Sequence, residues 1–190
     1  VKLQVTGHHT IANAVAAIAA ASAMKVPVEI SVAAMAGFTG LARRFDVVGT
    51  SNDISVIDDF GHNPDKIAAT LKTMKAFPGR IIAFFQPHGF GPIHKMGAEL
   101  AETFAELLDG DDRVVLCDPV YFGGTVDRSI GSNSITDAVN LAGGKAVHIP
   151  EREACGDHMV GIAEPGDRIV IMGARDDSLR TFAEGILKRL

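Results

Sequence analysis

Three short apolar runs constrain the fold of this chain more than any other feature. They lie at residues 81–85 (IIAFF), 114–116 (VVL) and 169–172 (IVIM), each followed closely by polar or glycine residues. A strand that is apolar at every position is typical of a sheet with helices on both faces, because neither face of such a strand meets water. Helical patterns separate the runs, so the sequence predicts an α/β fold with a mostly parallel, doubly wound sheet.

The expected elements alternate regularly from residue 44 to the end of the chain. Strands are expected at residues 44–49, 54–58, 80–86, 113–117, 146–149 and 168–172. Helices are expected at residues 64–77, 93–108, 134–142, 151–163 and 178–190. The first of these helices has Asn63 as a suitable N-cap and Pro64 at its first position.

The pattern upstream is different. Residues 10–25 and 28–36 are rich in alanine and indicate two helices, the first of them buried. The change from helices to strand–helix alternation falls near Gly40. We therefore expect a short helical segment over residues 1–40 and one α/β domain over residues 41–190.

Composition excludes several classes of protein. The 190 residues suffice for a domain with a buried core, and 47% hydrophobic residues are too many for a disordered chain. A net charge of −5 argues against nucleic acid as a partner. Cys117 and Cys155 are too few for a disulfide framework, which favours a reducing cytoplasm. We expect no signal peptide and no membrane segment, and the start at Val1 predicts a fragment.

Polar residues gather where the expected strands end, and ligands bind beyond the carboxyl ends of the strands in an open parallel sheet. Turn formation explains any single one of these ends, but four at one edge favour a binding site. The histidines are not spaced as zinc ligands, so no metal site is expected. The four ends are residues 58–62 (DDFGH), 86–91 (QPHGFG), 118–124 (DPVYFGG) and 173–177 (GARDD).

The two acids at the first of these ends differ in expected role. Adjacent strand residues point to opposite faces, so one of Asp58 and Asp59 is expected to be structural while the other reaches the ligand edge. A free carboxylate there suits ribose hydroxyls, an ammonium group or Mg²⁺. His62 either binds a substrate or closes the turn, whereas helix capping explains Asn63.

Four motifs, in order and spacing, resemble those of the Mur ligases, which use ATP to build the peptide stem of bacterial cell-wall precursors. The family patterns are Gly-x-His-Asn-x-x-Asn-Ala-x-Ala-Ala, Gly-Arg-Arg-Phe-Glu, Asp-Asp-Tyr-Gly-His-His-Pro and Phe-Gln-Pro-His-Arg. The resemblance covers essentially the whole chain. The matching segments are residues 7–17 (GHHTIANAVAA), 42–46 (ARRFD), 58–64 (DDFGHNP) and 85–88 (FQPH).

The resemblance implies that residues 41–190 form the Rossmann-like C-terminal domain of such a ligase. Residues 1–40 would be the tail of its central, ATP-binding domain. A phosphate-binding loop, Gly-x-x-Gly-Lys-[Ser/Thr], does not occur in these 190 residues. The resemblance therefore implies that ATP and Mg²⁺ are held mainly by a missing upstream domain. The implied partners are UDP-N-acetylmuramate, an amino acid or short peptide, and the missing N-terminal and central domains.

Individual roles also follow from the resemblance. Asn13 would contact the adenine, Arg44 the phosphate side of the nucleotide, and Asp59 the ribose. These residue types suit such contacts, because an amide matches a purine edge and a guanidinium offers several donors to phosphate. Arg44 and His62 are the implied catalytic residues.

Departures from the family patterns concern the substrate. Thr10 and Phe60 replace an asparagine and a tyrosine. Gly89 and Pro92 stand where the branch that adds L-alanine has two arginines, which hold a substrate carboxylate. Glycine does not replace a bidentate arginine. The last strand end, residues 172–176 (MGARD), also departs from the usual Gly-Ala-Gly-Asp.

Three interpretations therefore stay open. In the first, His88, His94 and Lys95 join His62 in binding the substrate and take over from the absent arginines. In the second, the substrate is a murein tripeptide, because the branch that recycles it also lacks the arginine pair and carries a Lys-Met-Gly like residues 95–97. In the third, the chain is a nucleotide-binding module without catalysis.

Overall fold

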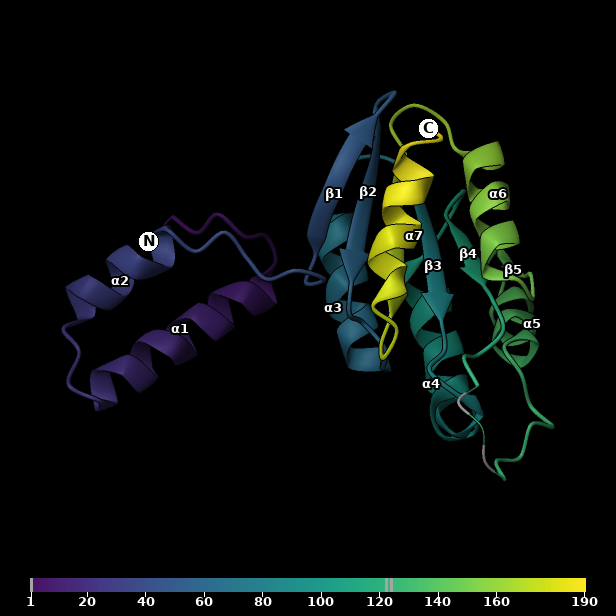
Figure 1. Cartoon of the computed structure of the whole chain (residues 1–190), viewed down its shortest axis with the longest axis horizontal. Coiled ribbons are helices and arrows are strands. Elements are labelled where there is room, and N and C mark those ends of the chain that lie inside the picture. Colours follow the sequence, from purple (N-terminus) through teal and green to yellow (C-terminus); the bar gives the residue numbers. More distant parts are fainter. Residues whose placement is uncertain (1, 122, 124) are drawn as a thin grey trace. The chain divides into compact units, whose positions relative to one another are not determined.

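The computed structural model describes residues 2–121, 123 and 125–190 (Figure 1). It divides the chain into two compact units, the first ending at Ala42 and the second running from Arg43 to Leu190. The first unit contains helix α1 (His8–Ala23) and helix α2 (Val28–Ala36). No helix in the described part of the chain is long and apolar enough to cross a membrane.

The helices of the first unit form as expected, but the expected burial of the first is not found. Ala14 is the one buried residue of α1. Two helices that pack on each other cover only one face of each, so large apolar side chains stay exposed. These are Ile11, Val15, Met24, Val28 and Ile30.

The second unit is built on a six-stranded sheet of order β1-β2-β6-β3-β4-β5. Strand β1 is antiparallel to β2, and all other neighbours are parallel, which confirms the mostly parallel sheet. The predicted apolar runs lie at the centre of the sheet, where β3 and β6 are almost entirely buried. The strands are β1 (Asp46–Ser51), β2 (Ile54–Asp59), β3 (Ile81–Gln86), β4 (Arg113–Leu116), β5 (Ala146–His148) and β6 (Arg168–Gly173).

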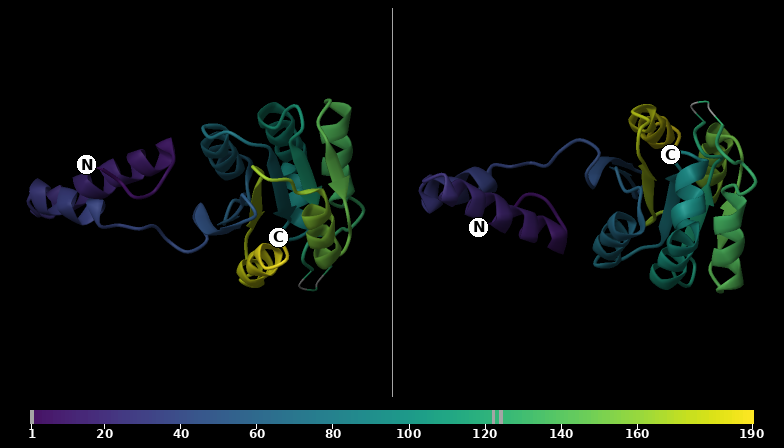
Figure 2. Two further views of the ribbon diagram at one scale, coloured as in Figure 1. Left: turned by 90° about the horizontal axis from the view of Figure 1, so that it is seen from above. Right: turned by 90° about the horizontal axis from the view of Figure 1, so that it is seen from below.

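Helices cover both faces of this sheet, as Figure 2 shows for α4 and α7 on opposite sides. One buried cluster joins the sheet to α3, α4 and α5, and a second joins its other face to α6 and α7. This arrangement confirms the α/β, doubly wound architecture. The helices are α3 (Pro64–Lys75), α4 (Phe90–Leu107), α5 (Asn133–Leu141), α6 (Arg152–Ile162) and α7 (Ser178–Leu187).

Local sequence explains how α3 begins. The Asn63 side chain accepts a hydrogen bond of 3.0 Å from the backbone N–H of Lys66, and Pro64 occupies the first helical position. Asparagine at the N-cap satisfies one of the N–H groups that the first turn leaves without a partner. The predicted cap is therefore confirmed, and it fixes the direction in which the chain leaves β2.

Strand β1 begins at Asp46, two residues later than predicted. Arg43 and Phe45 have backbone φ angles of +58° and +49°, which are incompatible with an extended strand. Arg44 therefore lies in a tight turn before the strand. This turn decides where the Arg44 side chain is presented.

Candidate functional site at the carboxyl edge of the sheet

The five parallel strands end at one edge, the carboxyl edge. At its centre β3 and β6 pair in register, with Gln86 opposite Gly173. The chain leaves β3 toward α4 on one face and β6 toward α7 on the other. Ligands of such folds bind where neighbouring connections diverge in this way. His88 and Arg175 each lie two residues beyond this pair.

Asp58 lies wholly buried beneath this edge. The Nε atom of Arg43 is 3.4 Å from its Oδ2 atom, and the Arg43 side chain is itself only 10% exposed. Burial raises the pKa of Asp58, although the positive charge of Arg43 acts in the opposite direction. Asp58 is therefore the structural member of the acid pair.

Asp59 points to the opposite face, as strand alternation predicts. Its Oδ2 atom accepts from the backbone N–H of Phe45 at 2.8 Å. Its Oδ1 atom accepts from the N–H of Gly61 at 2.7 Å and from the Thr70 hydroxyl at 3.0 Å. Neither acid is thus a free carboxylate at the edge, contrary to the expectation. A carboxylate has about four acceptor positions, so one of those of Asp59 remains for a ligand.

A row of side chains crosses the carboxyl edge. The guanidinium carbon of Arg44 lies 4.8 Å from the centre of the Phe60 ring. The Phe60 and His62 rings are 5.3 Å apart and nearly perpendicular, and so are the rings of His62 and His88. The row brings three predicted site residues, Arg44, His62 and His88, to one place.

Arg44 is exposed at one end of this row. Among the residues that the structure describes, no hydrogen bond or ion pair engages its guanidinium. Stacking on the Phe60 ring limits the motion of the side chain and leaves its N–H donors free. Such a group is suited to bind an anionic ligand.

His88 is partly buried at the other end of the row. Its Nδ1 atom is buried and lacks a hydrogen-bond partner within the described residues. Burial, with smaller contributions from His62 and Arg175, lowers the pKa of His88 below its usual 6.5. The imidazole is therefore neutral at pH 7 and offers hydrogen bonds, not charge, to a ligand.

The other predicted substrate residues lie on α4. The Nε2 atom of His94 is 3.2 Å from the carbonyl oxygen of Asp127, and Lys95 is exposed to solvent. No hydrogen bond or ion pair in the described part of the chain joins either residue to His62 or His88. Asn13 lies exposed on α1, in the first unit.

The turn after β6 was expected at this edge, but its charged residues were not among the individual residues predicted for the site. The Asp176 carboxylate accepts from Gln86 at 2.8 Å and from Arg152 at 2.9 Å. Arg175 is exposed and has a φ of +61°. The signals in the sequence were the place of residues 173–177 among the four strand ends and the arginine in Gly-Ala-Arg-Asp, where the family usually has glycine.

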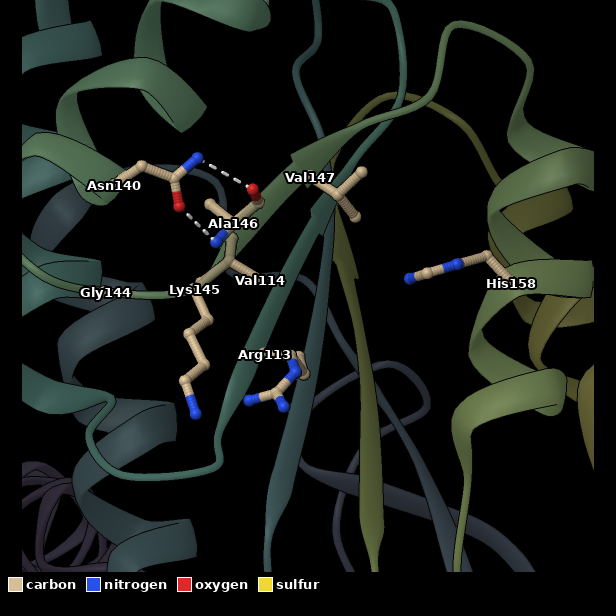
Figure 3. A pocket seen from close by; sticks show the side chains of 8 residues that line it. All are labelled: Arg113, Val114, Asn140, Gly144, Lys145, Ala146, Val147 and His158. Carbon is tan, nitrogen blue, oxygen red and sulfur yellow. Dashed lines mark hydrogen bonds between the residues drawn. The ribbon is translucent and has the colours of Figure 1, made fainter.

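Other features lie away from this edge. A depression of about 400 Å³ opens beside the amino ends of β4 and β5 (Figure 3). Its cations Arg113 and Lys145 both pair with Asp111, at 3.8 and 2.8 Å. No group of three or more potential metal ligands occurs among residues 2–121, 123 and 125–190. Of the predicted strand ends, residues 122 and 124 lie outside the described residues.

Known proteins resemble this chain along its whole length. The model of the protein family described as "Mur ligase, glutamate ligase domain" matches residues 43–175. A UDP-N-acetylmuramate–L-alanine ligase of Desulforamulus reducens is 33% identical over 192 residues, covering 100% of this chain and 40% of that protein. A solved UDP-N-acetylmuramate-alanine ligase of Thermotoga maritima has a TM-score of 0.75 at 25% identity, covering 100% of this chain and 39% of that one. A solved murein peptide ligase of Psychrobacter arcticus has a TM-score of 0.69 at 27% identity, and the match covers 100% of this chain and 38% of that one.

Sheet order, the family match and the structural neighbours together define the class, an α/β domain of the Mur ligase type. The chain belongs to the Mur ligase family. It spans about two fifths of the length of the curated relatives that it matches.

Proposed function

We propose that this chain is the C-terminal part of an ATP-dependent ligase that joins L-alanine to UDP-N-acetylmuramate. The observation that carries the proposal is the free guanidinium of Arg44, held on the Phe60 ring at the edge where Arg44, His62 and His88 of three family motifs come together. The 33% identity to a UDP-N-acetylmuramate–L-alanine ligase over the full chain supports the choice of substrates.

The chemistry proceeds in two steps in this proposal. An oxygen of the muramate carboxylate attacks the γ-phosphorus of ATP, ADP leaves, and an acyl phosphate forms. The amine of alanine then attacks the acyl carbon, the C–O bond to phosphate breaks, and the amine loses a proton. Negative charge is redistributed over the transferred phosphoryl group, and Arg44 would stabilise it there. His62, beside Phe60 and His88, would accept a hydrogen bond or a proton from the reacting groups.

ATP supplies the phosphoryl group and Mg²⁺ neutralises its charge, and we assign the main binding of both to an upstream domain. Within this chain, Asn13 is proposed to contact the adenine and Asp59 the ribose. The remaining acceptor position of Asp59 suits a hydroxyl donor. The reaction is proposed to take place in the cytoplasm, where ATP is available.

The first unit supports the presence of a larger ATP-binding domain. Its helices leave Ile11, Val15 and Ile30 exposed by more than half of their surface. Apolar side chains gathered on two short helices are typical of elements that pack against further protein. We propose that this unit is the tail of the central domain.

A murein tripeptide is the second candidate substrate. Gly89 has a φ of +140°, and an arginine would adopt this conformation only with strain. The murein peptide ligase of Psychrobacter arcticus is 27% identical to this chain. A module that binds nucleotide without catalysis is the third candidate.

Phosphate release by the full-length protein separates the three candidates. The protein is mixed with ATP, Mg²⁺ and UDP-N-acetylmuramate, and then with either L-alanine or the tripeptide L-alanyl-γ-D-glutamyl-diaminopimelate. We expect release only when all substrates are present, with a kcat/KM for alanine at least about tenfold higher than for the tripeptide, a difference of about 1.4 kcal/mol. The reverse preference would establish the tripeptide ligase, and absence of release with both would leave the binding module.

A further inference from the structure

Arg175 presents a free cation at the centre of the carboxyl edge. It lies two residues beyond the pair formed by Gln86 and Gly173, and the residue is exposed. No hydrogen bond, ion pair or ring contact in the described part of the chain engages its guanidinium. The positive charge is therefore available to a ligand.

The backbone of Arg175 is held in an unusual conformation by its neighbours. Its φ of +61° is uncommon for any residue other than glycine. Arg43 donates at 3.0 Å to the carbonyl oxygens of Gly173 and Asp176, on the two sides of Arg175. Strained residues persist where their surroundings fix them, and they concentrate at functional sites.

The Asp176 carboxylate strengthens the same turn. It accepts from Gln86, Arg152 and the Ser178 backbone, at 2.8, 2.9 and 3.0 Å. The nearest acid in the sequence is therefore occupied by its own partners and does not neutralise Arg175. The turn fixes the start of the arginine side chain while the charged group stays free, which is the arrangement of a preorganised anion site.

We propose that Arg175 binds the carboxylate of the incoming L-alanine, in place of the arginines that are absent at Gly89 and Pro92. This inference rests on the proposed function. His88 follows β3 as Arg175 follows the neighbouring strand β6. Like the guanidinium of Arg175, the buried Nδ1 atom of His88 has no hydrogen-bond partner among the described residues. The guanidinium from the turn after β6 and the neutral imidazole from the turn after β3 would hold a small carboxylate between them.

The row of rings separates this anion from the phosphates. Arg44 lies at the Phe60 end of the row, and His88 lies at the other end, where Arg175 acts on it electrostatically. Arg44 would thus serve the transferred phosphoryl group, and Arg175 the carboxylate of the amino acid. Arg175 is therefore a binding residue for the amine substrate and not for ATP.

The test compares L-alanine with L-alaninamide, which lacks the negative charge, in the full-length enzyme. In Arg175→Gln we expect the KM for alanine to rise about 30-fold, the loss expected for one hydrogen-bonded charge contact. The KM values for ATP and UDP-N-acetylmuramate should stay within about twofold of the parent. The parent's preference for alanine over alaninamide should largely disappear, and Arg175→Lys should restore part of it.

Two further variants separate binding from folding. Arg175→Asn keeps a residue that tolerates positive φ, so it should fold and show the same loss of preference. Arg189 lies beyond the end of α7 and pairs with Asp157. Because it is not part of the proposed site, Arg189→Gln should behave as the parent. An Arg175→Asn enzyme that retains both the KM for alanine and the preference over alaninamide would overturn the inference and leave the proposed ligase intact.

A tripeptide preference would also overturn the inference, because the alanine carboxyl group is then part of a peptide bond. A full-length protein that releases no phosphate with either amine substrate would remove the proposed function and this inference together.

Discussion

The guanidinium of Arg43 donates to the carbonyl oxygen of Gly173 at 3.0 Å and thereby joins the segment before β1 to the turn after β6. Arg43 directly precedes Arg44, and the turn that it holds contains Arg175. One buried side chain thus helps to position both Arg44 and Arg175. The buried Asp58 carboxylate, 3.4 Å from Arg43, compensates its charge.

Replacing Arg43 should therefore destabilise the second unit. Arg43→Gln leaves Asp58 buried without its charged partner and removes donors to Gly173 and Asp176, so the free energy of unfolding should fall by about 3 kcal/mol. Urea unfolding followed by circular dichroism measures this value. Arg189→Gln, which breaks an exposed ion pair with Asp157, is the matched control and should cost less than about 1 kcal/mol. An equal decrease in the free energy of unfolding for the two variants would show that the buried Arg43–Asp58 pair stabilises the unit no more than an exposed ion pair does.

Arg44→Ala should reduce turnover by the full-length enzyme about 100-fold or more. The guanidinium acts where negative charge is redistributed, so its loss affects the transition state more than the bound substrates. Steady-state phosphate release measures kcat, and Arg113→Ala at the opposite edge of the sheet is the control. A kcat within about threefold of the parent would mean that Arg44 does no more than stack on Phe60.

His88 should make stability depend on pH. Its pKa is lowered in the folded chain, chiefly by burial, so between this pKa and 6.5 the unfolded state binds more protons than the folded state. The free energy of unfolding should therefore decrease as pH falls below about 6.5, and His88→Gln should weaken this decrease. Urea unfolding at pH 7.5, 6.5 and 5.5 tests it, with His158→Gln as a control for losing an imidazole. An identical slope in parent and His88→Gln would contradict the assignment.

The 190-residue chain by itself should have no ligase activity. It contains no Gly-x-x-Gly-Lys-[Ser/Thr] loop to hold the phosphates of ATP. Phosphate release is measured with ATP, Mg²⁺, UDP-N-acetylmuramate and L-alanine, alongside the full-length protein at the same concentration. Release that depends on both UDP-N-acetylmuramate and alanine would show that this chain binds ATP productively without an upstream domain.

Local signals were sufficient to predict the sheet and the helix that leaves β2. Residues 81–85 and 169–172 are apolar at every position and form the buried centre of the sheet. Asn63 caps α3 as expected, because capping depends on neighbours three residues apart. Alternation along β2 also predicted that Asp58 and Asp59 point to opposite faces.

Long-range contacts account for what the sequence did not reveal. Apart from the N–H of Gly61, the partners of Asp58 and of Asp59 come from the turn before β1 and from α3, so no local pattern indicates how fully both carboxylates are occupied. The positive φ of Arg175 depends on hydrogen bonds from Arg43, which is 132 positions earlier in the chain. Such a conformation arises from tertiary contacts, so the conformational propensities of the local sequence do not predict it.

The transfer of oxygen-18 tests the acyl-phosphate chemistry most directly. The full-length enzyme is given UDP-N-acetylmuramate with both oxygens of the muramate carboxylate labelled, together with ATP, Mg²⁺ and L-alanine, and the released phosphate is analysed by mass spectrometry. Because the carboxylate oxygen that attacks phosphorus leaves with the phosphate, each phosphate should carry one labelled oxygen and the amide product should retain the other. Phosphate without label, formed while ATP is consumed, would contradict the proposed reaction.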